Sequence, residues 1–160
     1  MSRDGQIPVP LPVALSKLLS GVPTIGAAER AVLLMTTDEE LFPHACLLSR
    51  AQIKIEGNAI RIVVTSRFSA DNLRRTGRAT LIVGDEKHLH SCKLLCESVD
   101  DSVRGLTAFS LSLRWHKADG GGAVLTPLSF IVDDGAPERE RWDECTDVLE
   151  MRNAVGWSGA

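Results

Sequence analysis

The segment from Ile60 to Val83 constrains the fold of this chain more than any other part of the sequence. Its first residues alternate between β-branched apolar side chains and other residues, which predicts a strand that ends at Thr65. We expect Ser66 or Ser69 to cap a short basic helix, and Gly77 to end it. The strand pattern then resumes to the end of the segment. This order predicts a sheet with one helix placed between two of its strands.

Short strand patterns separated by turn residues fill most of the remaining chain. A helix is expected over residues 12–19, a turn over 27–30 and an amphipathic helix over 137–152. Six or seven strands joined by hairpins predict a mainly β protein, a small antiparallel barrel with peripheral helices. The further strands are expected at 31–37, at 43–50 with 51–55 continuing it or pairing beside it, and at 78–83, 88–98, 106–116 and 123–132, the last broken by Pro127. A tight hairpin turn over 56–58 is expected to lead into the strand that begins at Ile60.

Length and composition favour one soluble domain. The 160 residues divide into an N-terminal helical arm (1–30), a barrel domain with a C-terminal helix (31–152) and a flexible tail (153–160). A net charge of -3 gives no reason to expect a nucleic-acid partner. No apolar run approaches the ~20 residues that span a bilayer, so no membrane contact is expected. Four irregularly spaced cysteines suit reduced, mostly buried thiols, and we expect a cytoplasmic protein.

Polar residues gather where the first strand of the opening segment meets its helix. Thr65, Ser66, Arg67 and Ser69 combine hydroxyls and a guanidinium with the free amides of a helix N-terminus, and Arg75 follows nearby. Such groups can receive a phosphate monoester, because arginine binds two phosphate oxygens at once. The same residues also fit a polar turn whose serines only cap the helix. Both interpretations remain open from the residues alone.

The chain resembles the FMN-binding split-barrel family related to pyridoxamine 5'-phosphate oxidase. The resemblance covers residues 31–132. Three stretches carry it, namely Thr65-Ser66-Arg67, Asn72-Leu73-Arg74-Arg75 and the strand from Arg78 to Val83. The resemblance implies a six- to seven-stranded antiparallel split β-barrel. It also implies a homodimer with flavin sites at the subunit interface. In the family, this strand-turn-helix holds the flavin phosphate.

What the resemblance implies for function is an FMN-dependent oxidoreductase acting on a small-molecule substrate. The isoalloxazine ring carries the redox chemistry in such a protein, so catalytic side chains need not be marked in the sequence, and none is identified. The phosphate is expected on Ser66, Arg67 and Ser69, with the ring edge along the 63–65 backbone. The implied cofactor-binding residues are His44, Ser49, Val63, Val64, Thr65, Ser66, Arg67, Ser69 and Arg75.

Two positions depart from the family pattern. His44 stands where the oxidase has a basic residue on the second strand, and Ser69 stands where it has a lysine. The oxidase's C-terminal substrate element has no counterpart here, so pyridoxamine phosphate is not the expected substrate. The alternative is a non-redox split-barrel protein that binds heme or deazaflavin, or senses or stores flavin, and has lost tight FMN binding.

A second constellation lies on the predicted strand 88–98. His88, His90, Cys92 and Cys96 share one face of a regular strand. They span about 26 Å at ~3.3 Å per residue, so the four cannot reach one ion. At most His88 with His90, or His90 with Cys92, could ligate a metal with help from elsewhere. Buried cysteines and a surface histidine pair are the commoner explanation, and no metal site is expected.

Overall fold

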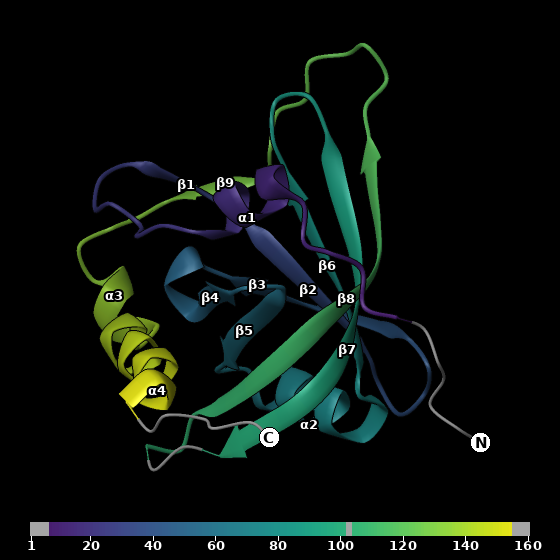
Figure 1. Ribbon diagram of the computed structural model, residues 1–160. Helices are drawn as coiled ribbons and strands as arrows, with labels where there is room; N and C mark the ends of the chain where they lie inside the picture. The colour runs from purple at the N-terminus through teal and green to yellow at the C-terminus, as the bar shows by residue number, and fades with distance from the viewer. Residues whose placement is uncertain (1–6, 102–103, 155–160) are drawn as a thin grey trace.

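Seven antiparallel strands form one curled sheet in the order β3-β2-β6-β7-β8-β5-β4. The computed structural model describes residues 7–101 and 104–154, with side chains to residue 151. The sheet confirms the predicted mainly β, antiparallel split barrel (Figure 1). Its strands are β2 (Val32–Thr37), β3 (Pro43–Leu48), β4 (Ile53–Glu56), β5 (Ala59–Val64), β6 (Arg78–Gly84), β7 (Leu89–Asp101) and β8 (Thr107–Asp119).

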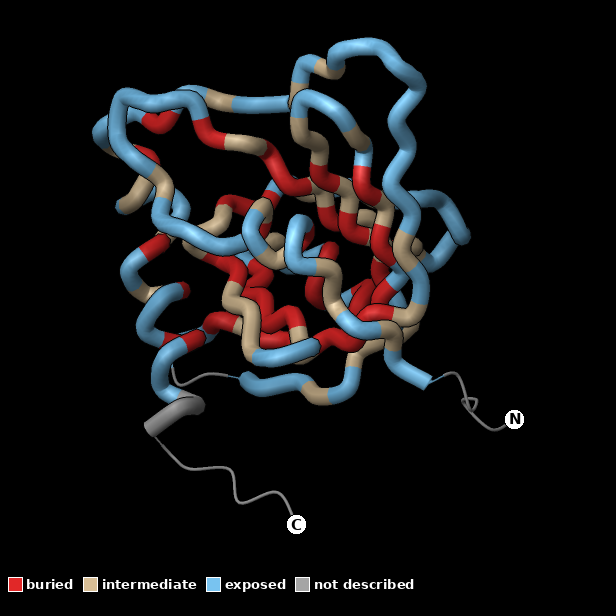
Figure 2. Tube along the Cα trace, turned by 45° about the horizontal axis from the view of Figure 1, so that its top comes forward, coloured by how far each residue is buried: buried red, intermediate tan, exposed pale blue. Residues whose placement is uncertain are grey.

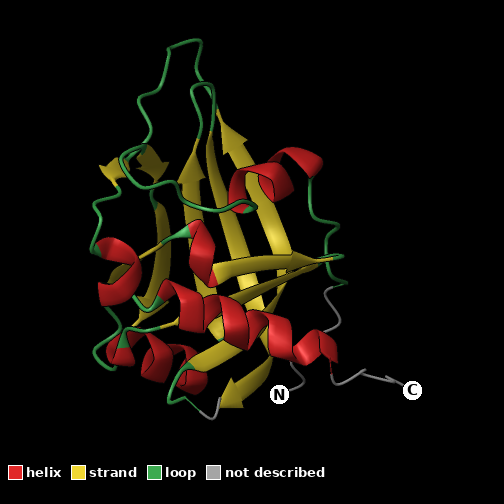
Figure 3. Cartoon of the chain, turned by 90° about the vertical axis from the view of Figure 1, so that its left-hand side faces the viewer, coloured by secondary structure: helices red, strands yellow, loops and turns green. Residues whose placement is uncertain are grey.

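Smaller elements surround this sheet (Figure 3). A second, two-stranded sheet pairs β1 with β9. The elements outside the main sheet are α1 (Val13–Leu19), β1 (Ala28–Arg30), the 3-10 turn η1 (Arg50–Gln52), α2 (Arg67–Thr76), β9 (Ser129–Ile131), α3 (Ala136–Arg139) and α4 (Trp142–Ala154).

Curvature of the sheet arises in the long β7–β8 hairpin. Its register shifts twice, between Lys93 and Leu94 and between Cys96 and Ser98. Each shift bends the strands and increases their twist, because an extra residue on one strand faces a single residue on the other. The two edge strands, β3 and β4, do not pair with each other within the described residues. The barrel is therefore open along one side.

Buried residues gather along the strands of the sheet (Figure 2), and their apolar side chains form one core cluster. The N-terminal arm contributes to this core, since Leu15 and Leu19 of α1 are fully buried in it. Val9 donates its backbone N–H to the Leu113 carbonyl at 2.8 Å, which ties the arm to β8. A ligand the size of a flavin must bind outside this filled interior. The strand residues of the core are Val32, Leu34, Leu48, Ile53, Ile60, Ile62, Val64, Ala79, Leu81, Val83, Cys92, Leu94, Phe109, Leu111 and Leu113.

Strand β5 is buried on both faces. Its outer face packs against α4, where Val63 joins a second apolar cluster with Cys145 and Leu149. Arg61 lies on the same outer face and is only 1% exposed. Its Nη1 donates to the Leu149 carbonyl at 2.8 Å, so the guanidinium ties α4 to the sheet.

Four sequence-based expectations on secondary structure need correction. Residues 28–30 form a strand rather than a turn, because β9 pairs with them. Residues 53–56 pair with β5 at the opposite edge of the sheet, because η1 ends the second strand at Leu48. The strand expected over 123–132 is limited to residues 129–131, beyond Pro127. The C-terminal helix is interrupted at Arg141, whose φ of 54° is incompatible with a continuous right-handed helix.

The C-terminal helix α4 runs to residue 154, and residues 155–160 of the expected tail lie outside the described residues. Among the described residues, no helix is long and apolar enough to cross a membrane.

Candidate functional site

Helix α2 is delimited at both ends by residues with a clear physical role. Ser66 is its N-cap, and its hydroxyl accepts from the Ser69 backbone N–H at 3.4 Å. Gly77 ends the helix with a φ of 66°, a left-handed conformation that glycine adopts without strain. The cap leaves the first turn of the helix open to the surface, because the chain enters it directly from the end of β5.

Unused hydrogen-bond donors collect at this first turn. The backbone N–H groups of Arg67 and Phe68 have no acceptor among the described residues. The Arg67 side chain is 92% exposed, and its one ion pair is a loose 3.8 Å contact with Asp71. These donors and the positive end of the helix dipole make the turn attractive to an anion.

Strand β3 supplies the other side of the same surface. The ring centroids of His44 and Phe68 are 6.3 Å apart, which places the imidazole beside the first turn of α2. Behind them, the buried Ser69 hydroxyl makes no conventional hydrogen bond and faces Cys46, two residues along β3. Burial raises the pKa of the Cys46 thiol, and the Ser69 hydroxyl lowers it in part. The structure therefore brings His44, Ser66, Arg67 and Ser69 together.

Val63, Val64 and Thr65 lie at the end of β5, just before the N-cap of α2. Thr65 is exposed, whereas Val63 and Val64 are buried. The pairing of β4 with β5 ends at Ile62, so no strand covers the β5 edge beyond it. The Val63 carbonyl accepts instead from Gln52 Nε2 at 3.2 Å. The backbone beside Thr65 is thus next to the first turn of α2.

Two of the expected site residues lie elsewhere. Arg75 is in the last turn of α2, about 12 Å along the helix axis from Arg67 at ~1.5 Å per residue. Its guanidinium donates to the Thr37 carbonyl. Ser49 is buried and caps η1, and its hydroxyl accepts from the Ala51 N–H at 2.9 Å. The side chain of Ser49 is therefore used in a local turn.

An open cleft of about 830 Å³ lies on the outer face of the sheet, next to the Thr37 end of β2. The sequence-based prediction did not include it. Lys93 Nζ lies 4.7 Å from the ring centroid of Trp115 inside this cleft, a cation–π contact between neighbouring strands. The β7–β8 register, which the sequence pattern alone does not give, puts these two side chains opposite each other. The cleft is lined by Met35, Thr36, Thr37, Pro43, Arg78, Ala79, Thr80, Lys93, Leu94, Leu95, Arg114 and Trp115.

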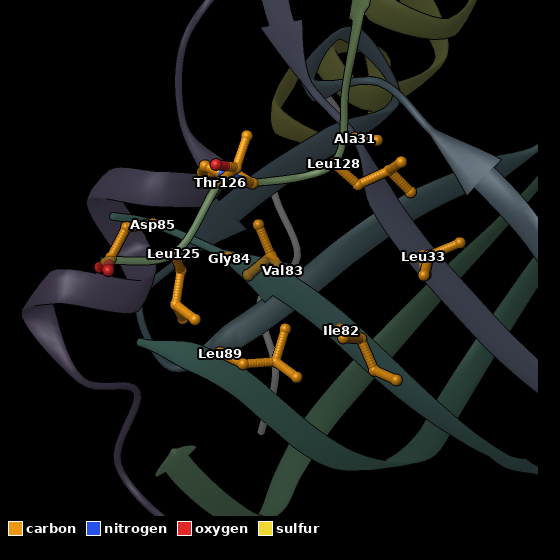
Figure 4. Close-up of a pocket in the computed structure, with 11 residues that line it drawn as sticks. Ala31, Leu33, Ile82, Val83, Gly84, Asp85, Leu89, Leu125, Thr126 and Leu128 are labelled. Carbon is orange, nitrogen blue, oxygen red and sulfur yellow. The ribbon is translucent and has the colours of Figure 1, made fainter. Parts of the chain in front are cut away.

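A smaller, mostly apolar cavity of about 160 Å³ lies between β2, β6 and the segment 125–128 (Figure 4). Asp85 stands at its rim, and its carboxylate is turned away from the apolar side chains that line the cavity (Figure 4). The same carboxylate lies close to His88 and His90.

The β6–β7 turn gathers three side chains with metal-ligating atoms. One such atom from each of Asp85, His88 and His90 lies within 4.8 Å of the other two. Cys92 is buried in the core, and its pKa is raised to about 12 by burial, so it is a core residue. His116 on β8 joins from outside the predicted set, with its Nε2 3.0 Å from His90 Nδ1.

Comparison with known proteins identifies the class to which this fold belongs. No protein-family model and no curated protein matches the sequence. Among solved structures, the styrene monooxygenase flavin reductase from Pseudomonas putida S12 is similar with a TM-score of 0.53 and 12% identity, over 67% of this chain and 88% of that one. A conserved hypothetical protein from Mycobacterium tuberculosis is similar with a TM-score of 0.50 and 12% identity, over 75% and 90%. The chain therefore has the split-barrel fold that a flavin reductase also has.

Proposed function

We propose that this protein binds FMN, with the phosphate at the first turn of α2, and acts as a flavin-dependent oxidoreductase on a small-molecule substrate. The observation that carries the proposal is the set of unused donors at one point of the surface. The amides of Arg67 and Phe68, the exposed guanidinium and the nearby His44 all lie there. The fold similarity to a flavin reductase supports the same cofactor class.

The residues present fit a phosphate monoester. The fit rests on the exposed groups, because the Ser69 hydroxyl is fully buried and faces the Cys46 thiol. Arg67 is held by no strong ion pair, so its planar fork is available to two phosphate oxygens. In this proposal, the amides of the first turn and Arg67 bind the phosphate, and His44 supplies a further polar contact from β3.

The edge of β5 that β4 leaves uncovered ends at Thr65, where we propose that the ring of the same cofactor binds. When bound, FMN supplies the two-electron redox chemistry, and the protein positions it and excludes water. Of the backbone from Val63 to Thr65, the ring would contact the part at Thr65, because Val63 and Val64 are buried and the Val63 carbonyl already accepts from Gln52. Phe68 is 74% exposed next to this edge and would shield the bound cofactor from water.

We further propose that a second copy of the chain completes the site. Strand β3 is an edge of the sheet, and apolar side chains lie exposed on and around it. An exposed edge strand with apolar neighbours is typical of a surface that binds another protein chain. A homodimer across β3 would place the partner next to His44 and the first turn of α2. The exposed apolar residues are Leu41, Phe42, Leu47 and Phe68.

A second candidate function is non-redox binding of heme, deazaflavin or a stored flavin. The observation that favours it is the position of Arg75, which bonds to Thr37 and leaves Arg67 as the arginine at the first turn of α2. A phosphate held by one arginine and one histidine is bound less tightly than one held by several cations.

The visible absorption spectrum of the protein, purified without added cofactor and then titrated with FMN, separates the two functions. Flavin absorbance with saturable quenching of FMN fluorescence supports flavin binding, and NAD(P)H oxidation by the loaded protein then separates the oxidoreductase from flavin storage. A Soret band, or no FMN binding at tens of micromolar, supports the second.

A further inference from the structure

The β6–β7 turn brings a carboxylate and two imidazoles together. Asp85 Oδ1 accepts from the backbone N–H groups of Lys87 at 2.8 Å and His88 at 2.6 Å. These bonds orient the carboxylate, so that Oδ2 faces His90 Nε2 at 3.4 Å. His88 Nδ1 lies 3.9 Å from Oδ1 of the same carboxylate. The turn thus directs three potential ligand atoms to one point.

One of these separations already matches a metal centre before any ion is bound. Two ligands at ~2.0–2.1 Å from a tetrahedral ion are about 3.4 Å apart. The His90–Asp85 pair already has that spacing, and the widest separation in the set is within 4.8 Å. Rotation of the half-exposed His88 side chain is enough to close the remaining gap, since it lies in a turn rather than inside a strand.

His90 is oriented by a residue from the neighbouring strand. It is buried, and its Nδ1 lies 3.0 Å from His116 Nε2, with the two rings nearly parallel at 12°. If His90 donates Nδ1–H to His116, its Nε2 lone pair is directed at the Asp85 carboxylate. Metal-bound histidines characteristically donate their other N–H in this way, which fixes the tautomer and the ring.

The loop after β8 packs against the same site. Gly120 leaves no room for a side chain, because a Cβ there would lie 2.7 Å from the Lys87 carbonyl oxygen and 2.8 Å from His88 Cδ2. The Leu125 N–H donates to the Glu86 carbonyl at 2.9 Å. The β6–β7 turn and this loop lie side by side (Figure 1), so His88 is held between them.

We propose that Asp85, His88 and His90 form a binding site for a divalent transition-metal ion such as Zn²⁺, with His116 as a positioning residue. Two imidazoles and a carboxylate suit borderline ions of the first transition row. Three protein ligands leave one tetrahedral position for water or an exogenous ligand. The site does not involve α2, and it stands independently of flavin binding.

The test is metal binding by the untagged full-length chain. Co²⁺ is titrated while its visible d–d bands are followed, and Zn²⁺ then displaces it to give the stoichiometry and affinity. We expect one ion per chain, and a loss of affinity of at least tenfold in His88→Ala and in Asp85→Asn. His44→Ala, which removes the histidine outside the cluster, is the matched control and should bind as the wild type does.

If Asp85, His88 and His90 only stabilise the β6–β7 turn and bind no metal, the variants should differ in thermal stability but not in their response to Zn²⁺. Thermal midpoints of each variant without metal detect any loss of fold, and His88→Ala is the decisive variant because its side chain is half exposed. Addition of Zn²⁺ should raise the midpoint of the wild type and of His44→Ala but not of His88→Ala. The proposal is overturned if the wild type binds neither Co²⁺ nor Zn²⁺. It is also overturned if His88→Ala and Asp85→Asn bind these ions as tightly as the wild type does.

Discussion

His44 on β3 and Phe68 on α2 lie ring to ring, with centroids 6.3 Å apart and an interplanar angle of 53°. The contact joins the edge strand of the barrel to the helix that follows β5. It places a titratable imidazole next to the amides that open α2, so the proposed phosphate site is built from two separate parts of the chain.

Ser66→Asp should separate the fold of α2 from its ligand. Aspartate caps a helix as well as serine does, so the thermal midpoint is expected to stay close to that of the wild type. The new carboxylate would repel a phosphate dianion, and FMN affinity is expected to fall at least tenfold. Ser66→Ala is the control. It removes the cap at a cost of about 1 kcal/mol and adds no charge, so its FMN affinity should fall less.

The Glu29–Arg50 ion pair should be a major source of stability. Glu29 is buried and receives two bonds from Arg50, from Nε at 2.6 Å and from Nη2 at 2.9 Å. Arg50→Ala leaves a buried carboxylate without its cation, which costs about 3–5 kcal/mol. Urea unfolding measures the loss. The double variant Glu29→Gln/Arg50→Ala should recover part of it, and an equal or greater loss in the double variant would contradict this account.

Alkaline pH should destabilise the protein through two buried thiols. Burial raises the pKa of Cys92 to about 12 and of Cys145 to about 11, from an ordinary 9.0. A raised folded-state pKa favours the neutral thiol, so the stabilisation is complete below pH 9 and is lost as the pH rises towards those values. The slope is about 1.4 kcal/mol per pH unit for each thiol.

Urea unfolding between pH 8 and pH 11 measures how the free energy of unfolding falls with pH, which we expect to be about 1.4 kcal/mol per pH unit for each thiol. Lysine ionisation contributes to the slope in every variant, whereas tyrosine does not, because the chain has none. The informative quantity is therefore the difference between the wild type and Cys92→Val. The variant should lose stability less steeply, and parallel curves would show that the Cys92 thiol does not cause the effect.

Leu47→Glu should weaken the proposed dimer. The Leu47 side chain is 56% exposed on the edge strand β3, so a charge there should leave the fold intact but oppose association. Light scattering after size exclusion measures the mass. Val124→Glu, at another exposed apolar side chain, is the matched control and should remain dimeric. A wild type that is monomeric at all concentrations would exclude the shared site.

The parts of the fold that depend on local pattern could be predicted from the sequence. The alternation in β5, the Ser66 cap and the Gly77 stop are set by neighbouring residues, and each is present. The tight turn over 56–58 likewise predicts the hairpin that joins β4 to β5, and it is present. The place of this hairpin at one edge of the sheet depends on the long-range pairing of β5 with β8. The burial of Arg61 depends on Leu149, which lies 88 residues away in the sequence.

The metal-ligating cluster, too, could be predicted only in part from local sequence pattern. His88 and His90 were recognisable by their spacing, and their neighbour Asp85 lies in the turn just before them. His116 could be added only with the β7–β8 register, in which it stands opposite Cys92. To predict a site built from several strands, one therefore needs the pairing of the strands and not only the pattern of the sequence.

Binding of FMN and riboflavin by the wild type and Arg67→Ala, each measured by fluorescence titration, tests the central claim most directly. The two ligands differ by the phosphate alone. Arg67 is almost fully exposed, so its removal should not alter the fold. A charge-assisted bond of about 1.5–3 kcal/mol predicts that Arg67→Ala binds FMN roughly tenfold to a hundredfold more weakly and riboflavin unchanged. Equal FMN affinity in the two proteins, with Arg139→Ala as the control for charge, would contradict the phosphate site at α2.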